Sequence, residues 1–249
     1  KFADANRSLS TQMKATGEVM SVGRTLEESL LKAVRSLETG VCHIYHKKFD
    51  DWDTARLLEY IRTATDDRLY AIAQLIRLGV DLGMVYNATK IDMFFLEKFK
   101  HIVEFEEVIR NNPNNVDTIR DAKLLGISDK YIAQVWGCTE HDIYRMRAEN
   151  NIYPVYKMID TCASEFSSYV PYFYSTYEAE NESVVSDRKK IVVLGSGPIR
   201  IGQGVEFDYS TVHAIWSIRR AGYEAIIINN NPETVSTDYT TSDKLYFEP

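Results

Sequence analysis

Residues 190–209, which read KIVVLGSGPIRIGQGVEFDY, decide the fold of the C-terminal part of this chain. The apolar run 190–194 predicts a buried strand that enters a glycine-rich turn. A helical pattern follows at about 209–221, and Gly222 separates it from a second apolar strand at 225–228. A strand, a helix and a strand in this order predict a βαβ unit of a parallel sheet.

The last residues add a third strand to this prediction. Residues 244–249 read KLYFEP, an apolar run that follows polar turn residues. A three-stranded sheet with so few helices leaves apolar surface uncovered, so we expect the α/β domain of residues 189–249 to be truncated. The first residue is Lys1 and not Met, and we likewise expect the chain to be cut from a longer protein.

The glycine-rich turn of residues 195–205 has the composition of a ligand-binding loop. Glycines let backbone amides approach a ligand, and the start of the following helix favours anions. A dinucleotide fingerprint needs glycine at the sixth position of the turn, where this chain has Arg200. The second strand ends in Asn229, Asn230 and Asn231 instead of the acidic residue that binds a ribose. The sequence therefore disfavours binding of a nicotinamide dinucleotide.

The composition is that of an ordinary soluble protein. Of 249 residues, 45% are hydrophobic and 26% are charged, and the formal net charge of -7 argues against nucleic-acid or membrane-surface binding. The cysteines Cys42, Cys138 and Cys162 are odd in number and far apart, which favours a reducing, cytoplasmic compartment. No apolar run reaches the roughly 20 residues that cross a bilayer.

Helical patterns dominate the first 150 residues. Thr25 and Glu28 form a capping-box pattern, and a helix is predicted at about 26–38. Apolar stripes at helical spacing recur up to residue 150 and stop at glycine, asparagine or proline, with Ser128 and Thr139 as expected N-caps. We therefore expect residues 38–150 to form an all-helical domain. The run of residues 17–23, bounded by glycines, predicts a short strand.

The pattern changes after residue 150. Residues 151–188 contain prolines and many tyrosines without clear periodicity, and residues 178–190 are polar and charged. We interpret 151–188 as an extended connecting segment that ends in a linker. The predicted fold class is a mainly helical domain followed by a truncated α/β unit.

Four blocks of the C-terminal part carry a family resemblance. In order, they are residues 195–209, Gly222-Tyr-Glu224, 231–239 (NPETVSTDY) and 245–249 (LYFEP). They resemble the opening of the second half of the large subunit of carbamoyl phosphate synthetases, called the pre-ATP-grasp domain. Residues 12–25 resemble the end of the ATP-grasp region of the first half. The blocks within 154–177 resemble the link between the two halves.

The resemblance implies a function for the parent protein. Enzymes of this family are ATP-dependent ligases of arginine and pyrimidine biosynthesis, and they make carbamoyl phosphate from bicarbonate, glutamine-derived ammonia and two MgATP. A glutaminase subunit or domain supplies the ammonia, and the helical domain is named for oligomerisation. By this resemblance, residues 1–37 are the end of the first ATP-grasp half and residues 38–150 are the oligomerisation domain. Residues 151–188 are the connecting segment, and residues 189–249 are the start of the second half, a truncated pre-ATP-grasp domain.

The same resemblance places the ATP-binding and magnesium-binding residues of both halves outside this chain. We therefore expect residues 1–249 to hold no catalytic, cofactor-binding or metal-binding residue and to be inactive alone. The expected partners are the glutaminase and a second copy of the helical domain, without nucleic acid or membrane.

Carbamate made by the first half passes through the interior of these enzymes to the second half. By motif, the resemblance places Arg200, Gly204, Glu206 and Glu233 along this passage. Glycine leaves space for a passage, and buried carboxylates need water or an arginine partner. The alternative is that these residues only shape the turn and cap the following helix.

Three weaker patterns have simpler interpretations. Residues 128–147 have helix-turn-helix spacing, and a DNA-binding or regulatory module fused to a nucleotide-binding fold is the competing hypothesis, although the second helix is not basic. Cys42, His43 and His46 lack a fourth metal ligand. The aromatic stripe is expected to be core, with any excess on one face serving a subunit contact; it comprises Phe94, Phe95, Phe99 and Phe105.

Overall fold

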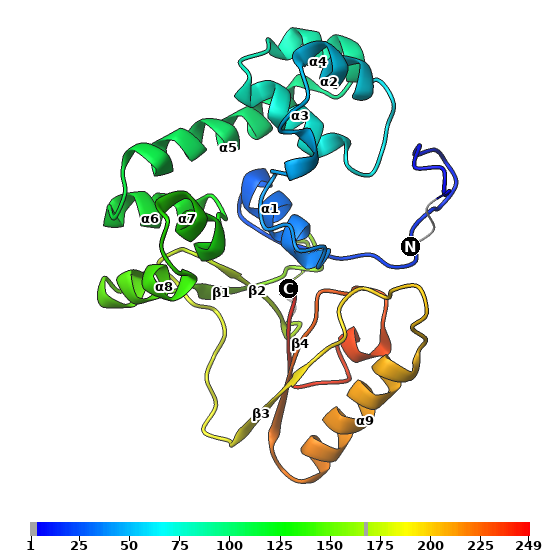
Figure 1. Ribbon diagram of the computed structural model, residues 1–249. Helices are drawn as coiled ribbons and strands as arrows, with labels where there is room; N and C mark the ends of the chain where they lie inside the picture. Colours follow the sequence, from blue (N-terminus) through cyan, green and yellow to red (C-terminus); the bar gives the residue numbers. More distant parts are fainter. Residues whose placement is uncertain (1–3, 167–168) are drawn as a thin grey trace. The chain divides into compact units, whose positions relative to one another are not determined.

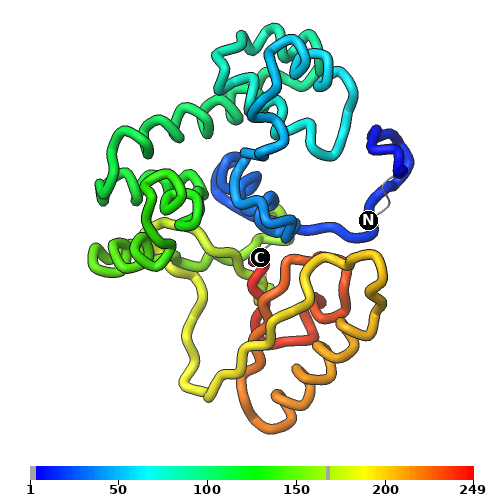
Figure 2. The backbone as a smooth tube through the Cα atoms, in the orientation of Figure 1, coloured from blue at the N-terminus to red at the C-terminus, as the bar shows by residue number. Residues whose placement is uncertain are grey.

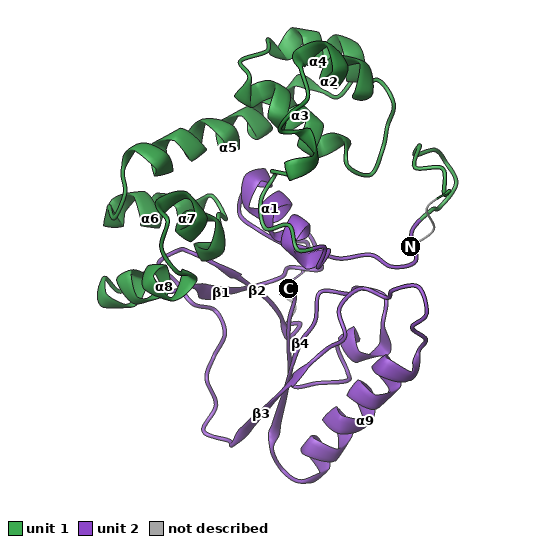
Figure 3. Cartoon of the chain, viewed as in Figure 1, with its two compact units in different colours: residues 1–14, 40–151 green, residues 15–39, 152–249 purple. Residues whose placement is uncertain are grey.

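A computed structural model of the chain describes residues 4–166 and 169–249. Residues 1–3 and 167–168, which fall within the predicted segments 1–37 and 151–188, lie outside the described residues. The chain divides into two compact units (Figure 3). Unit 1 comprises residues 1–14 and 40–151, and unit 2 comprises residues 15–39 and 152–249.

Unit 1 is helical, as the sequence predicts. Its elements are η1 (Lys47–Phe49), α2 (Thr54–Tyr60), α3 (Arg68–Arg77), α4 (Leu82–Thr89), α5 (Met93–Asn111), α6 (Val116–Leu124), α7 (Asp129–Trp136) and α8 (Glu140–Glu149). The core between them is mainly aliphatic, and its fully buried members include Leu57, Leu75, Leu96, Ile102 and Ile109.

The expected caps of α7 and α8 are present. Ser128 accepts a hydrogen bond from the amide of Tyr131, and Thr139 forms a capping box with Asp142. Gly137 ends α7 in the left-handed region at φ 70°, which glycine adopts without strain. Each side-chain cap of this kind stabilises its helix by about 1 kcal/mol. The helix-turn-helix spacing therefore corresponds to two real helices that pack together.

The short helix α4 is not anticipated by the sequence pattern. Its eight residues include Gly83 and carry no apolar stripe, so periodicity gives no signal. The helix forms because Asp81 caps its start, accepting from the amide of Gly83, and Lys90 ends it in the left-handed region. Local capping thus compensates for a weak helical sequence.

The segment at residues 7–9 is bound to unit 1 by charge and backbone contacts. The Arg7 guanidinium donates to the Asp66 carboxylate at 2.7 Å, and the amide of Leu9 donates to Ala64 O at 2.6 Å.

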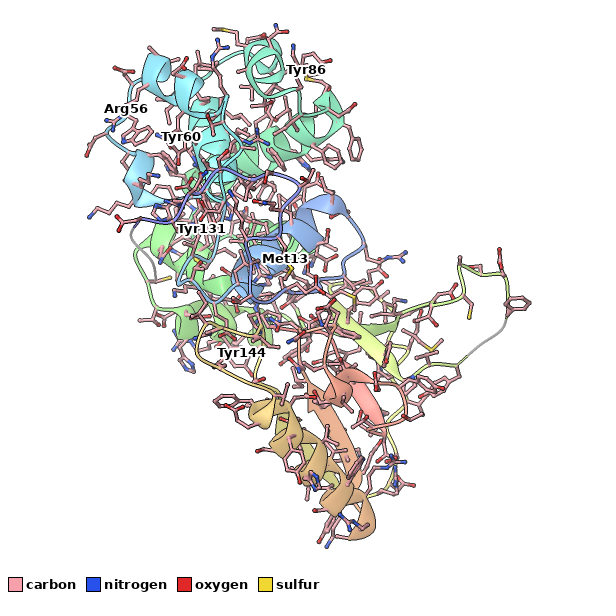
Figure 4. The ribbon with its side chains drawn as sticks, turned by 90° about the vertical axis from the view of Figure 1, so that its right-hand side faces the viewer. Met13, Arg56, Tyr60, Tyr86, Tyr131 and Tyr144 are labelled. Carbon is pink, nitrogen blue, oxygen red and sulfur yellow. The ribbon has the colours of Figure 1, made fainter. Side chains whose placement is uncertain are left out.

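Asp67 accepts from the hydroxyl of Tyr60, labelled in Figure 4, at 2.6 Å. Burial would raise the pKa of Asp67, but its hydrogen bonds lower that pKa to about 2.

Unit 2 is built on a mixed sheet (Figure 1). Within the described residues its strands lie in the order β1-β2-β5-β4-β3. Strands β2, β5, β4 and β3 are parallel, and β1 is antiparallel to β2. The strand bounds are β1 Val155–Met158, β2 Tyr172–Thr176, β3 Lys190–Leu194, β4 Glu224–Ile228 and β5 Lys244–Tyr246.

The predicted βαβ unit and the third strand are confirmed. Helix α9 (Glu206–Arg220) packs on β3 and β4, and Ile215 meets Ala225, Ile227 and Leu245 in one buried cluster. Strands β1 and β2 are not anticipated by the sequence, because their polar and aromatic residues show no alternating pattern. Strand β2 joins the sheet by pairing with β5, which lies far away in the sequence, and β1 pairs with β2.

The polar stretch between β2 and β3 is anchored along one strand. Figure 2 follows the chain through residues 177–189, which contain no helix or strand. The Glu182 carboxylate accepts from the amide of Met158 at 2.7 Å, and Asn181 accepts from the amide of Tyr156 at 2.9 Å. The predicted linker therefore continues the edge of the sheet beside β1.

The stretch 15–39 folds onto the same sheet. The predicted helix is confirmed as α1 (Leu26–Ser36), with Thr25 as its N-cap. Lys32 donates to Val22 O at 2.9 Å and pairs with the Glu248 carboxylate at 3.3 Å. The strand predicted at residues 17–23 is wrong, although the amide of Met20 donates to Asn230 O at 2.8 Å. A single backbone bond does not make a ladder.

Candidate functional site at the carboxyl edge of the sheet

Unit 2 gathers its polar and glycine residues at one edge of the sheet. Strands β3, β4 and β5 are parallel, so their carboxyl ends meet. The glycine-rich turn 195–205 follows β3, Asn229–Asn231 follow β4, and Glu248 follows β5. Open α/β sheets bind their ligands outside this edge.

Three buried asparagines follow β4, and the last of them, Asn231, holds the glycine-rich turn in place. Asn229, Asn230 and Asn231 are each at most 3% exposed. The Asn231 side chain donates to Gly197 O at 3.2 Å and accepts from the amide of Glu233 at 3.0 Å. An amide side chain both donates and accepts, so it can join two loops without burying a charge. This explains why neutral residues follow β4.

The start of α9 disfavours an anion. Its first turn contains Glu206 and Asp208, and its N-cap, Val205, has no side-chain hydrogen bond. The Asp208 carboxylate accepts from the amide of Ser236 at 3.2 Å, which joins α9 to η2 (Val235–Thr237). The negative charges of these two carboxylates interact with the positive end of the helix dipole, so they would repel a bound anion there.

The structure brings together two of the four predicted passage residues. Gly204 and Glu233 line one pocket of about 150 Å³, together with Ile199, Phe207 and Val235. Glycine at position 204 leaves the wall of this pocket free of a side chain. Arg200 and Glu206 do not belong to this lining.

The other two predicted residues make local contacts. The Glu206 carboxylate accepts from the amide of Gly204 at 3.3 Å, a bond that shapes the turn and supports the alternative role. The Arg200 guanidinium pairs with the exposed carboxylate of Glu38. Arg200, which the sequence suggested as an ion-pair partner for Glu206 or Glu233, thus pairs with Glu38, just after the end of α1.

Glu18 is a residue of this site that sequence reasoning missed. Its carboxyl shares a hydrogen bond with the Glu233 carboxyl, and this bond raises the pKa of Glu18 above its ordinary value. The only signal in the sequence was its place in the block 16–20, which carries part of the family resemblance.

Comparison with protein families agrees with this architecture. A family model described as the carbamoyl-phosphate synthetase large chain, oligomerisation domain, matches residues 18–151. A second, described as the carbamoyl phosphate synthase preATP-grasp domain, matches residues 187–249. The first match alone spans more than half of the chain. This chain belongs to the carbamoyl-phosphate synthetase large-chain family.

The family decides between the two interpretations of the sequence. Unit 1 contains the helices that match the oligomerisation domain of the synthetase. The βαβ unit lies within the match to the preATP-grasp domain. Helices α7 and α8 fall within the oligomerisation match, so they need no DNA-binding role. Among residues 4–166 and 169–249, no helix is both long and apolar enough to cross a membrane.

The histidines of the synthetase oligomerisation domain have structural partners. His43 Nε2 lies 2.9 Å from Glu106 Oε1, and the His43 ring stacks on Tyr131 at 3.8 Å. His46 Nδ1 accepts from the amide of Lys48 at 3.1 Å, and Cys42 is half-buried. Across the described ranges, no group of three or more His, Cys, Asp or Glu side chains could hold a metal ion.

Proposed function

We propose that this chain is the oligomerising and connecting segment of a carbamoyl phosphate synthetase, and that it positions the start of the second synthetase half. The complete enzyme would make carbamoyl phosphate from bicarbonate, glutamine-derived ammonia and two ATP, with a glutaminase subunit or domain as partner. The observation that carries this proposal is the order of the two family matches on one chain.

The sheet of unit 2 supports the connecting role. Strands β1 and β2 lie between the two matched regions, and β2 pairs with β5 of the preATP-grasp domain. The segment that leaves the helical domain thus becomes part of the sheet that opens the next half. Residues 15–39, which the oligomerisation match partly includes, pack on the same sheet.

The chain alone is expected to hydrolyse no ATP. Phosphoryl transfer needs charged groups and Mg²⁺ arranged around the phosphates, and the resemblance places those residues outside positions 1–249. The measurement is bicarbonate-dependent phosphate release by the purified chain, with a buffer blank and an unrelated protein prepared in parallel. Activity clearly above both blanks, which co-purifies with the chain through two columns, would refute this expectation.

An apolar patch on unit 1 supports self-association. We define the α4–α5 patch as Leu78, Met84, Tyr86, Phe94 and Phe95, which are between 41% and 52% exposed. The sequence predicted Phe94 and Phe95 as core; this is wrong, whereas Phe99 is buried as expected. The same elements line a pocket of about 630 Å³. Contiguous exposed apolar residues are typical of protein contacts, and two-fold pairing is the commonest arrangement.

Removing the two phenylalanines is expected to weaken the dimer. The double variant Phe94→Ser/Phe95→Ser should raise the dimer dissociation constant at least about thirtyfold, because central aromatic anchors contribute most of an interface's energy. Sedimentation velocity over a hundredfold concentration range measures this constant. The matched control is Val184→Ser/Val185→Ser, a second adjacent apolar pair with more than 70% exposure, in unit 2. Equal effects of the two double variants, or a strictly monomeric parent chain, would contradict the proposal.

We also propose that Arg200, Gly204, Glu206 and Glu233 lie along the passage for carbamate. The shared pocket of Gly204 and Glu233 supports this role. The bond from Gly204 to Glu206 favours a turn-shaping role for Glu206. Replacing Gly204 with leucine in the complete enzyme separates the two roles.

A further inference from the structure

The stretch 15–39 belongs to unit 2 but lies between two sections of unit 1 in the sequence. The chain passes from one unit to the other after residue 14 and again after residue 39. Residues 18–39 fall within the match to the oligomerisation domain, yet they fold with the sheet that contains the preATP-grasp match. The two ends of this stretch are therefore covalent junctions with the helical unit.

The first end of the stretch contacts Ile199, in the middle of the glycine-rich turn. The Thr16 hydroxyl donates to Ile199 O at 3.3 Å. A Cβ atom on Gly17 would lie 2.7 Å from Ile199 N, which is closer than a side-chain carbon can pack against a backbone nitrogen. Only glycine at position 17 therefore lets the two backbones lie this close.

The other end of the stretch contacts the next residue of the turn. The Glu38 carboxylate pairs with the Arg200 guanidinium, and the two side chains are 41% and 54% exposed. Glu38 follows Leu37, the C-cap of α1, and has a φ of 51°. Glycine is the usual residue at this left-handed position. Glutamate is thus less favourable for the end of the helix than glycine, and the ion pair with Arg200 is the interaction that its side chain adds.

The contacted residues determine the shape of the turn. The amide of Arg200 donates to Gln203 Oε1 at 3.0 Å, and the amide of Gln203 donates to Arg200 O at 2.9 Å. Ile199 and Gly204, which flank this pair of bonds, both line the pocket of about 150 Å³. A displacement of Ile199 and Arg200 would therefore change the wall of that pocket.

Helix α1 is anchored without the help of the turn. Lys32 is 5% exposed, donates to Val22 O at 2.9 Å and to Ser175 O, and pairs with the Glu248 carboxylate at 3.3 Å. A buried ammonium with several oxygen partners fixes α1 on β2 and on the end of β5. The end of α1 is thus a rigid support for Arg200.

We propose that Gly17 and Glu38 are positioning residues of the complete synthetase. They hold Ile199 and Arg200, and through them the glycine-rich turn, in the shape that the second half needs. This inference rests on the proposed function, in which the turn opens that half. Both residues lie within three positions of a point where the chain passes to unit 1, so the turn is held directly beside both junctions.

Replacing Glu38 with glycine separates positioning from folding. Glu38→Gly removes the ion pair but places the preferred residue at the end of α1, so the melting temperature should stay equal or rise. Hydrogen exchange at the amides of Arg200 and Gln203, measured by NMR on the chain, should become about threefold faster, which is the scale of an exposed ion pair. Glu38→Gln, which removes only the charge, should accelerate exchange at the same amides.

Lys90→Gly is the matched control for Glu38→Gly. Lys90 is also a charged residue at the left-handed end of a helix, with a φ of 59° after α4, and it belongs to unit 1. This variant relieves the same backbone strain without removing a contact of the turn. Exchange at Arg200 and Gln203 should therefore be the same as in the parent chain.

Two variants test the contacts of Ile199. Gly17→Ala forces the backbone of Ile199 to move and should accelerate exchange at Arg200 and Gln203 at least about tenfold. Thr16→Val keeps the shape of the side chain and removes only its hydrogen bond, so its effect should be smaller.

The complete synthetase shows whether the shape of the turn matters for the reaction. Glu38→Gly is expected to lower carbamoyl phosphate formation about tenfold while bicarbonate-dependent ATP hydrolysis stays within about twofold, because small displacements of a positioned group cost rate without cost in stability. Lys90→Gly should change neither activity.

Three results would overturn the inference: unchanged exchange in both Glu38 variants, equal acceleration in Lys90→Gly, or undiminished carbamoyl phosphate formation by Glu38→Gly. None of them affects the oligomerising role, which is tested by sedimentation. If the complete parent protein formed no carbamoyl phosphate, the proposed function would fail. The exchange measurements on the chain would then still decide whether Gly17 and Glu38 hold the turn.

Discussion

Gly204→Leu in the complete synthetase is expected to leave bicarbonate-dependent ATP hydrolysis within about twofold, while carbamoyl phosphate formation falls by roughly a hundredfold. The leucine side chain would enter the pocket of about 150 Å³ that Gly204 and Glu233 share. The atoms nearest to a Cβ at position 204 belong to the side chain of Glu206, which is exposed and can rotate away. The fold should therefore accept the substitution while the passage closes.

A graded series sharpens this prediction. Gly204→Ala adds one carbon and should reduce synthesis far less than Gly204→Leu, and neither variant should lower the melting temperature appreciably. Loss of both activities together with thermal stability would favour the turn-shaping role. Unchanged synthesis in the leucine variant would remove Gly204 from the passage.

The second large effect is expected at a buried ion pair in unit 1. Glu106 is 3% exposed, and Arg77 donates to both of its oxygens, at 2.8 and 2.6 Å. His43 lies 2.9 Å from the same carboxylate. Arg77→Met should lower the free energy of unfolding by about 3–5 kcal/mol, because it leaves a buried carboxylate without its main partner. Urea unfolding followed by far-UV circular dichroism measures this loss.

An exposed ion pair provides the control for Arg77. Arg62 and Glu59 are 3.1 Å apart, with side chains at least 62% exposed. Arg62→Met should cost less than about 1 kcal/mol, since exposed pairs contribute little. A cost for Arg77→Met no greater than that of Arg62→Met would show that the buried pair does not stabilise unit 1.

The same pair predicts how stability depends on pH. Burial alone would raise the pKa of Glu106, but the hydrogen bonds from Arg77 and His43 lower it to about 2. A depressed carboxyl pKa stabilises the folded state above the ordinary value near 4.5 and loses this contribution as pH falls toward 2. Acid unfolding between these limits should be steeper in the parent chain than in Glu106→Gln.

The parts of the fold that sequence could predict are those with local causes. The apolar run 190–194, the glycine turn and the strand 225–228 lie within forty residues of each other, and all three were predicted. Ser128 and Thr139 were recognised as caps because a cap acts on amides two or three residues away. Strand β2 has its partner β5 about seventy residues later, and no local pattern announces such pairing, while β1 pairs with β2.

The candidate site divides in the same way. Gly204 and Glu233 were predicted from motifs, and the structure places them on one pocket. Glu18 and Glu38 reach the edge of the sheet from the stretch 15–39, well over one hundred residues earlier in the sequence. Only tertiary packing brings Glu38 to Arg200 and Gly197, so no spacing rule could have named it.

The position of residues 40–151 within the sequence of unit 2 has a consequence for synthesis on the ribosome. Helix α1 finds its contacts late, because Lys32 and Ser175 are 143 residues apart and Ser36 and Asn230 are 194 apart. The helical unit can complete its core before the later residues that contact α1 have been synthesised. During this time the apolar side of α1 is uncovered. Nascent chains arrested near residue 190, where residues 40–151 have left the ribosomal exit tunnel, should therefore hold a protease-resistant helical unit and a protease-sensitive segment at 15–39.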